Sequence, residues 1–225
     1  MNNSESKYIN NNQFRKKEII YDVFRESDLE QTIACITEVF PIREPMTRAL
    51  GFTPDEYYFF AEIYCKKAAK EGLSAVAKDR ATGKVIGFCI SEDLASEPIE
   101  GIEKINVKSY PIIALLASLD EEYRKTHKVE KGHIFHLYMV GVSEPYENQN
   151  IATILLDKNL KLAKMKKFSC VIAEATGSVS QHILRDKLGF KEKFSIEYES
   201  FTYKGENVFK NIEGAHSCIL VEKKL

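Results

Sequence analysis

The chain lacks an excess of charge of either sign. Its 32 Lys and Arg residues are balanced by 33 Asp and Glu residues, which gives a formal net charge of −1. A nucleic-acid-binding or anionic-membrane-binding surface normally carries a basic excess, so we expect no nucleic acid and no membrane partner. Apolar runs long enough to span a bilayer are also missing from the sequence. The remaining composition, 44% hydrophobic and 29% charged, is that of an ordinary globular protein.

Cysteine is sparse and has no recognisable spacing. The number of cysteines is odd, and no Cys-x-x-Cys pair or Cys/His ligand spacing occurs. This pattern argues against a disulfide framework and against a zinc site, so we expect no metal. We predict reduced, mostly buried thiols and a cytoplasmic protein. The five residues are Cys35, Cys65, Cys89, Cys170 and Cys218.

The N-terminal segment lacks the apolar stretch of a signal peptide. Residues 1–17 are polar and rich in Asn. We therefore predict a disordered polar tail over residues 1–17 and a single domain over residues 18–225.

Two common nucleotide-binding loops are missing as well. The sequence has neither the Lys of a Walker loop nor a Gly-x-Gly-x-x-Gly run. It has instead an apolar strand over 134–142, a polar turn, and a helical run over 153–167. Asn148 and Asn150 lie in the turn, and Asn adopts left-handed backbone angles more easily than most residues. Since the first turn of a helix offers unpaired N–H groups, we predict a phosphate-binding turn here.

Helices and strands interleave along the rest of the chain. Ser27 to Glu30 reads as a capping box, with Ser27 as the N-cap of a helix that ends near Phe40. Thr53 to Glu56 is a second capping box, and its helix should end near Gly72. Strands are expected near 19–24, 73–78, 85–90, 168–174, 191–201 and 215–222, and helices over 110–127 and 178–188. Segment 91–108 is polar and long for a connection, which is typical of a lid or of disorder.

The turn resembles the pyrophosphate-binding motif of the GNAT N-acetyltransferases, Gln/Arg-x-x-Gly-x-Gly/Ala, at Glu147 to Ala152. Glu147 stands where Arg or Gln is usual, and Asn150 stands where Gly is usual. Segment 40–51 is similar to the Phe-x-x-Asp-Glu-Pro-Leu segment of the insect-type arylalkylamine N-acetyltransferases. Segment 198–210, together with His216, is similar to the C-terminal part of that group. The order of predicted strands and helices is also that of the GNAT enzymes.

The resemblance implies an α/β (α+β) fold with a mixed, mostly antiparallel central sheet. Helices would flank the sheet, and the sheet would splay apart at the strand that binds acetyl-CoA. The implied function is direct acetyl transfer from acetyl-CoA to a small primary amine in a ternary complex, by a monomer or a homodimer. The implied acetyl-CoA-binding residues are Val140, Gly141, Val142, Glu147, Asn148, Gln149, Asn150, Ile151, Ala152 and Thr153.

Glu44 matches the general base of the insect-type enzymes. An alkylamine is protonated at neutral pH, so a carboxylate is a natural acceptor for its proton. The alternative is a solvated Glu in a polar turn. Ser178 and Ser180 match serines of the same enzymes and would protonate the departing thiolate. Ser178 also begins a capping box that ends at Gln181, so it could instead cap a helix.

His136 and Tyr138 alternate with Val140 and Val142 along the central strand. Alternation places all four on one face, which would line the acetyl pocket. Tyr57 and Tyr198 are further candidates, and an aromatic pocket would suit an arylalkyl amine. The predicted substrate-binding residues are Tyr57, His136, Tyr138 and Tyr198. Core packing, and for His136 an ordinary buried histidine, are the alternatives.

Two other functions fit the sequence. The acceptor could be a polyamine, an aminoglycoside or a protein amine, which the Glu-rich segment 91–103 would favour by making the cleft acidic. The chain could also be a CoA-binding module without catalysis. The departures at Glu147 and Asn150 motivate that reading, as does Arg185, which stands where many GNAT enzymes have a Tyr.

Overall fold

The computed structural model describes residues 18–225, so the tail predicted for residues 1–17 lies outside the described residues. In the described part, seven strands form one sheet in the order β1-β2-β3-β4-β5-β7-β6. Every neighbouring pair is antiparallel except β4 and β5. This confirms the predicted mixed, mostly antiparallel sheet.

The elements follow the predicted order closely. One short helix, Pro45–Ala49, and several 3-10 turns are added, and a π-helical segment over Ile183–Lys187 continues the short helix that begins at Ser178. The strands are β1 Ile19–Val23, β2 Ala75–Asp79, β3 Val85–Asp93, β4 Ile134–Val142, β5 Cys170–Ala175, β6 Lys191–Glu197 and β7 Ser217–Lys224. The helices are α1 Leu29–Arg43, α2 Pro45–Ala49, α3 Pro54–Glu71, α4 Tyr110–Thr126, α5 Ile151–Met165 and α6 Ser178–His182.

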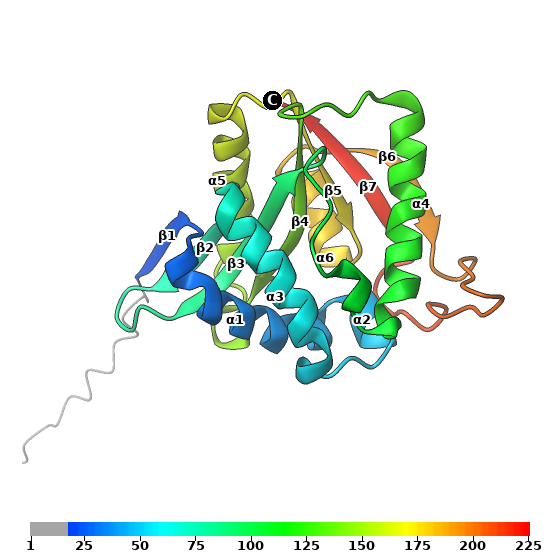
Figure 1. Cartoon of the computed structure of the whole chain (residues 1–225), viewed down its shortest axis with the longest axis horizontal. Helices are drawn as coiled ribbons and strands as arrows, with labels where there is room; N and C mark the ends of the chain where they lie inside the picture. Colours follow the sequence, from blue (N-terminus) through cyan, green and yellow to red (C-terminus); the bar gives the residue numbers. More distant parts are fainter. Residues whose placement is uncertain (1–17) are drawn as a thin grey trace, which may run out of the picture.

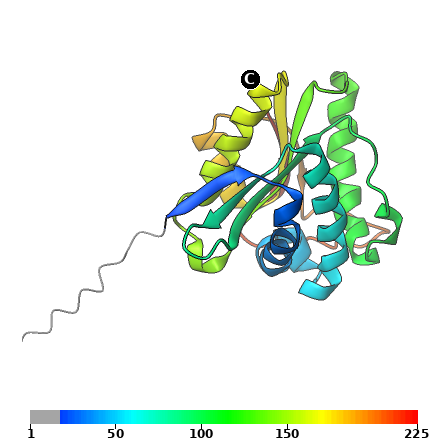
Figure 2. The ribbon, with the colours of Figure 1, turned by 60° about the vertical axis from the view of Figure 1, so that its left-hand side comes forward.

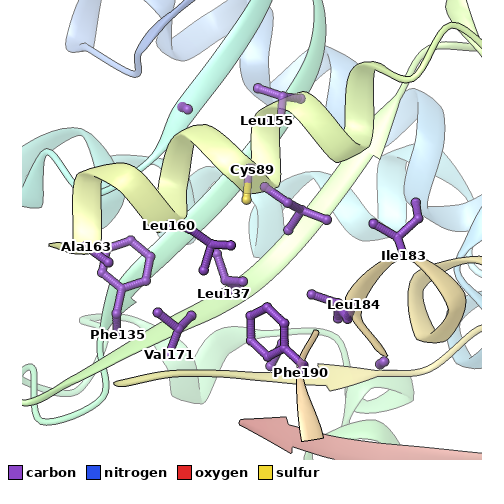
Figure 3. Packing of buried hydrophobic residues seen from close by; sticks show 14 of the residues in the cluster. Cys89, Phe135, Leu137, Leu155, Leu160, Ala163, Val171, Ile183, Leu184 and Phe190 are labelled. Atoms are coloured by element: carbon purple, nitrogen blue, oxygen red, sulfur yellow. The ribbon is translucent and has the colours of Figure 1, made fainter. Parts of the chain in front are cut away.

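Helices cover both faces of the sheet, which gives three layers. The helices α1, α3 and α4 lie on one face and α5 and α6 on the other (Figures 1 and 2). The second face holds the largest buried cluster, in which Leu155 and Leu160 of α5 pack over Leu137 of β4 and Val171 of β5 (Figure 3). Burying these apolar side chains holds α5 against the centre of the sheet.

The two central strands separate part-way along their length. Parallel pairing of β4 and β5 runs only from Ile134 and Cys170 to Leu137 and Ala173. Strand β4 continues to Val142 on its β3 side, where Gly87 pairs with Val142. The peptide groups of β4 beyond Leu137 are therefore not paired with β5. This is the splay that the sequence resemblance implied.

The prediction that His136, Tyr138, Val140 and Val142 share one face is wrong. Ser91 pairs with Leu137 and Ile90 with Met139, so Tyr138 is an extra residue in a β-bulge. A bulge reverses the alternation of side chains beyond it. Val140 and Val142 therefore pack on the α5 side with the cluster of Figure 3, whereas Tyr138 and Met139 pack on the α1–α3 side.

The predicted beginning of the first helix is also wrong. Ser27 lies inside a 3-10 turn, Glu26–Asp28, and is no N-cap. Asp28 holds the N-cap position of α1, but its carboxylate makes no capping bond to that helix. It accepts the N–H of Arg25 at 3.3 Å within the 3-10 turn and pairs with Lys78 Nζ at 2.6 Å. The helix also runs past Phe40 to Arg43, because Pro41 removes only one helical hydrogen bond and the next turn continues.

The predicted boundaries of the second helix are confirmed. Thr53 Oγ1 accepts the N–H of Glu56, and Glu56 Oε2 accepts the N–H of Thr53 at 2.9 Å. At the other end, Gly72 has a left-handed conformation with φ of 63°. Such a φ favours glycine, which explains why α3 ends there.

The long connection predicted over 91–108 is partly regular. Residues 91–93 belong to β3, and two 3-10 turns follow, Ile102–Lys104 and Val107–Ser109. Ile105 is 4% exposed and belongs to the cluster formed with α1 and α3. The segment therefore packs on the outside of α3, because its isoleucine side chains are buried or partly buried there.

The cysteines are free in the described structure, as predicted. Cys170 is partly exposed, and the other four are buried. Within residues 18–225, no helix combines the length and the apolar character needed to cross a membrane.

The variant Gly141→Ala should destabilise the protein. A Cβ at Gly141 would lie 2.5 Å from Cζ of Phe88, and the Phe88 ring is fully buried and cannot move aside freely. We expect a loss of about 1–3 kcal/mol in the free energy of unfolding, measured by urea denaturation. Ser195→Thr, which adds a methyl group to an exposed strand position, is the control and should change it by less than about 0.5 kcal/mol. Equal stability of Gly141→Ala and wild type would contradict the close packing at this position.

Candidate functional site

A cleft of about 950 Å³ opens where β4 and β5 separate. Its walls come from the end of α1 and from α2, from β4 beyond Leu137, and from the end of β5. The start of α5, residues of α3, α4 and α6, and the loop 211–214 also line it. Because two strands diverge here, the cleft reaches the interior of the sheet without disrupting its hydrogen bonding elsewhere.

The polar turn lies at one end of this cleft. Asn148 and Asn150 have φ of 60° and 62°, which confirms the predicted left-handed conformations. Helix α5 begins at Ile151, and its first internal bond runs from the N–H of Ile154 to the carbonyl of Asn150. The N–H groups of 151–153 therefore have no partner within the helix. Since these residues line the cleft, an anion there would meet both the N–H groups and the positive end of the helix dipole.

Glu147 does not point freely into this end of the cleft. Arg43, the last residue of α1, places its guanidinium 3.0 Å from Glu147 and 3.3 Å from Glu144. Arg43 and Glu147 both line the cleft. The guanidinium of Arg43 thus neutralises the carboxylate of Glu147, which replaces the usual Arg or Gln of the motif.

Glu44 lies between α1 and α2 and lines the cleft. It is the N-cap of α2: its carboxylate accepts the N–H of Met46 at 3.1 Å and that of Thr47 at 2.6 Å. Burial raises the pKa of Glu44, and hydrogen bonds from Thr47, Met46 and the Thr176 hydroxyl oppose that rise. A carboxylate with a raised pKa accepts protons more readily, so both the capping role and a base role are open to Glu44.

The predicted cap at Ser178 is wrong, because the N-cap of α6 is Gly177. The hydroxyl of Ser180 donates to the carbonyl of Gly177 at 2.9 Å and accepts its N–H at 3.3 Å. Ser180 thus closes the first turn one residue earlier than the pattern suggested. Both serines line the cleft.

Aromatic side chains line part of the cleft or lie directly behind its lining. Tyr57 stacks against Phe40 with ring centroids 5.7 Å apart, and both line the cleft. Tyr138 donates to the hydroxyl of Tyr64 at 2.7 Å and stacks on its ring. Tyr198 is buried and donates to the carbonyl of Thr176 at 2.7 Å.

A buried ionic network stands behind the cleft wall. His136 Nδ1 lies 3.0 Å from Glu92 Oε1, and Nε2 lies 2.7 Å from Glu174 Oε2. Glu92 in turn pairs with Lys67 of α3. Of these groups Glu174 lines the cleft, whereas His136 does not. His136 is therefore a buried histidine with both ring nitrogens hydrogen-bonded, which was the alternative to a role in lining the pocket.

The carboxylates decide the charge of this histidine. Burial alone would lower the pKa of His136, but attraction to Glu174 and hydrogen bonds with Glu174 and Glu92 outweigh it and raise the pKa to about 10. Burial would raise the pKa of Glu92, and the bonds from His136 and Lys67 lower it instead to about 2. His136 is therefore an imidazolium at neutral pH.

Solved structures with the same arrangement are known. A C-terminal condensation domain of Ebony, in complex with beta-alanyl-dopamine, aligns with a TM-score of 0.83 at 19% identity over 93% of this chain and 100% of that one. Arylalkylamine N-acetyltransferase 2 from Aedes aegypti gives 0.78 at 20% identity over 92% and 99%. Polyamine N-acetyltransferase from Drosophila melanogaster gives 0.74 at 16% over 92% and 100%. No protein-family model and no curated protein matches the chain.

The chain has the fold of the GNAT acetyltransferases. In this GNAT fold, most of the residues predicted for the site come together in the cleft. Those that line it are Glu44, Tyr57, Tyr138, Val140, Gly141, Val142, Glu147, Asn148, Asn150, Ile151, Ala152, Thr153, Ser178 and Ser180. Gln149, His136 and Tyr198 do not line it. The bulge changes how β4 lines the cleft, because Val140 and Val142 enter it from the α5 side rather than beside Tyr138.

The sequence reasoning missed several charged residues of the cleft, namely Arg43, Arg48, Glu174, Lys187 and Glu213. Glu174 had a signal: it is an acid inside the short apolar strand 170–175, and a buried charge needs a partner. Arg43 had none, because its partner Glu147 lies over a hundred positions away in the sequence.

The stability of the fold should fall as the pH rises from about 7 towards about 10. The pKa of His136 is raised in the folded state, so the unfolded chain loses this proton first and each pH unit costs up to about 1.4 kcal/mol. The contribution is fully present below about pH 6.5. We expect His136→Gln to flatten this alkaline slope in urea denaturation series, and the exposed His133→Gln to leave it unchanged. An alkaline slope that persists in His136→Gln would contradict the assignment.

Proposed function

We propose that this protein is an acetyl-CoA-dependent N-acetyltransferase that acts on a small primary amine, with an arylalkylamine as the favoured class. One observation carries the proposal: the cleft at the splay is lined by a helix N-terminus with its Asn turn, and also by the Glu44 carboxylate and aromatic side chains. The helix N-terminus suits a pyrophosphate, and the carboxylate suits an amine. The free thiols fit a reducing compartment, and we propose the cytoplasm.

The pyrophosphate of acetyl-CoA would lie on the N–H groups at the start of α5. Asn150, which stands where Gly is usual, already has a left-handed conformation, and so does Asn148. The pantetheine arm would then run between β4 and β5, with the thioester carbonyl near the unpaired peptide N–H groups around Val140 to Val142. These donors would polarise the carbonyl and stabilise the oxyanion of the tetrahedral intermediate.

Glu44 would accept the proton that the ammonium must lose before its nitrogen attacks the thioester. Tyr57 supports this position for the amine, because burial and the nearby Glu44 carboxylate raise the pKa of Tyr57 well above its usual value. The tyrosine thus stays neutral beside the reacting amine. Collapse of the intermediate breaks the carbon–sulfur bond, and the thiolate takes a proton from Ser178 or Ser180. The nitrogen loses its second proton as the amide forms, and that proton returns the serine to its neutral form. The Ser180 hydroxyl is already engaged with Gly177, which favours Ser178.

The alternative acceptors are a polyamine, an aminoglycoside or a protein amine. The argument for these acceptors from the sequence was an acidic cleft formed by the Glu-rich segment 91–103. No residue of that segment lines the cleft. Glu174 and Glu213 line it instead, so an acceptor with a second positive group remains an outcome to test. A CoA-binding module without catalysis is the remaining alternative.

A panel of amines tests the proposal directly. Purified protein would be mixed with acetyl-CoA and serotonin, dopamine, tyramine, spermidine or a lysine peptide, and free thiol would be measured. Fast release with the arylalkylamines supports the proposed class. Release with spermidine or the peptide alone would support the alternative acceptors instead. Absence of release with any of them, with CoA bound, indicates the non-catalytic module.

Glu44→Gln should lower kcat/KM for the accepted amine by about 100- to 10,000-fold, because the amide cannot take a proton. The amide oxygen can still accept an N–H bond from α2, so the fold and the affinity for CoA should be preserved. Glu38→Gln, an exposed position on α1, is the control. Unchanged turnover of Glu44→Gln across the pH range would reject Glu44 as the base.

Arg43→Gln should weaken CoA binding by about 3- to 10-fold, because Glu147 would face the pyrophosphate without its partner. Glu147→Gln should leave the affinity equal or higher, since it removes the repulsive charge. Titration calorimetry with CoA measures both, and the remote Arg80→Gln serves as the control. If Arg43→Gln binds as tightly as wild type, Arg43 has no part in holding the pyrophosphate.

A further inference from the structure

We propose that Glu174 is a second carboxylate of the acceptor site, which holds the substrate ammonium while Glu44 removes its proton. The inference rests on the proposed function and deepens it. It assigns different tasks to two acids of the cleft: Glu174 binds charge, and Glu44 moves a proton.

The position of Glu174 is the first argument. It is the residue of β5 directly after Ala173, the last residue paired with β4, so it stands at the opening of the splay. Its side chain is 9% exposed and lines the cleft. Only one of its oxygens is used, because Oε2 bonds to His136 and the described residues give Oε1 no hydrogen bond. That second oxygen is available to a cation in the cleft.

The distance between the two acids is the second argument. Thr176 lies two residues after Glu174, and residues two apart in an extended chain point to the same side at a spacing of roughly 7 Å. The hydroxyl of Thr176 hydrogen-bonds to the carboxylate of Glu44. The charges of Glu44 and Glu174 also both raise the pKa of the buried thiol of Cys218, so both acids lie near it. The two carboxylates therefore lie in the same part of the cleft.

The different surroundings of the two acids are the third argument. Glu174 bonds to a cationic partner, the ring of His136, at 2.7 Å. Glu44 receives only neutral donors, and burial raises its pKa. When two carboxylates share a site, such a difference in environment separates their tasks.

The groups behind His136 keep this arrangement in place. Glu92 of β3 bonds to the other ring nitrogen, and Lys67 of α3 pairs with Glu92. Glu71 of α3 lies 3.5 Å from Lys67, and Tyr138 contacts the imidazole edge-on. Glu92 thus shares the charge of His136, and without it the imidazolium would be neutralised by Glu174 alone. Glu92 is therefore a positioning residue that acts on the cleft without touching the substrate.

The experiment compares a charged with an uncharged acceptor of similar shape. The amine accepted in the panel, for example tyramine, is paired with an arylalkyl hydrazide, which is uncharged at neutral pH. We expect Glu174→Gln to raise KM for the amine about tenfold with a smaller change in kcat, and to leave KM for the hydrazide within about twofold. Glu92→Gln should raise KM for the amine about threefold and also spare the hydrazide. Glu30→Gln, on the exposed side of α1, is the control.

The outcomes separate this inference from the proposed function. Equal losses for both acceptors would mean that Glu174 and Glu92 only support the fold, and an unchanged KM for the amine would mean that Glu174 does not hold it. Either result overturns the inference while transfer by wild type upholds the function. Calorimetric binding of the amine to the CoA complex gives a readout without turnover. Weaker binding to Glu174→Gln than to wild type supports the inference even if no acetyl transfer occurs, and equal binding rejects it.

Discussion

The site depends on one constraint, the divergence of β4 from β5 after the pair Leu137 and Ala173. Parallel strands cannot separate without leaving peptide groups unpaired, and such groups are costly unless something else satisfies them. Here they face a cleft rather than packed side chains. The bulge at Tyr138 and the close contact between Gly141 and Phe88 hold β4 against β3 while it leaves β5. The gap is therefore a fixed part of the sheet, and it supplies donors at the place where a thioester carbonyl would need them.

Charge is arranged around this gap by pairs that join distant parts of the chain. Arg43 of α1 reaches Glu147 in the turn before α5, and His136 joins Glu92 to Glu174 across three strands. Isolated charges would be too costly to bury, so each is compensated by a partner from another element. The result is a cleft with an electropositive end at the start of α5 and an acidic region near Glu44. That polarity is what an anionic cofactor tail and a cationic acceptor would require.

Much of the fold was readable from local patterns. The capping box at Thr53, the glycine after Glu71 and the Asn residues at 148 and 150 all behave as their chemistry predicts. The errors have a common cause. The N-cap position of α1 is Asp28 and not Ser27, and that of α6 is Gly177 and not Ser178. The alternation of side chains in β4 is reversed by a bulge. In each case the structure of a neighbouring residue or strand overrode the local pattern, and the local pattern alone does not show that effect.

The sequence by itself determined the order of the elements, the left-handed Asn turn before a helix and the position of Glu44 after a helix end. These follow from short-range physics: periodicity, capping and the backbone angles that Asn and Gly allow. Only the tertiary structure decided that Arg43 neutralises Glu147, that His136 is charged and lies behind the cleft wall, and that Glu174 faces into it. Those facts depend on side chains far apart in the chain that meet in a place of low water content. There, the energy of a charge is set by its partners and not by its neighbours in sequence.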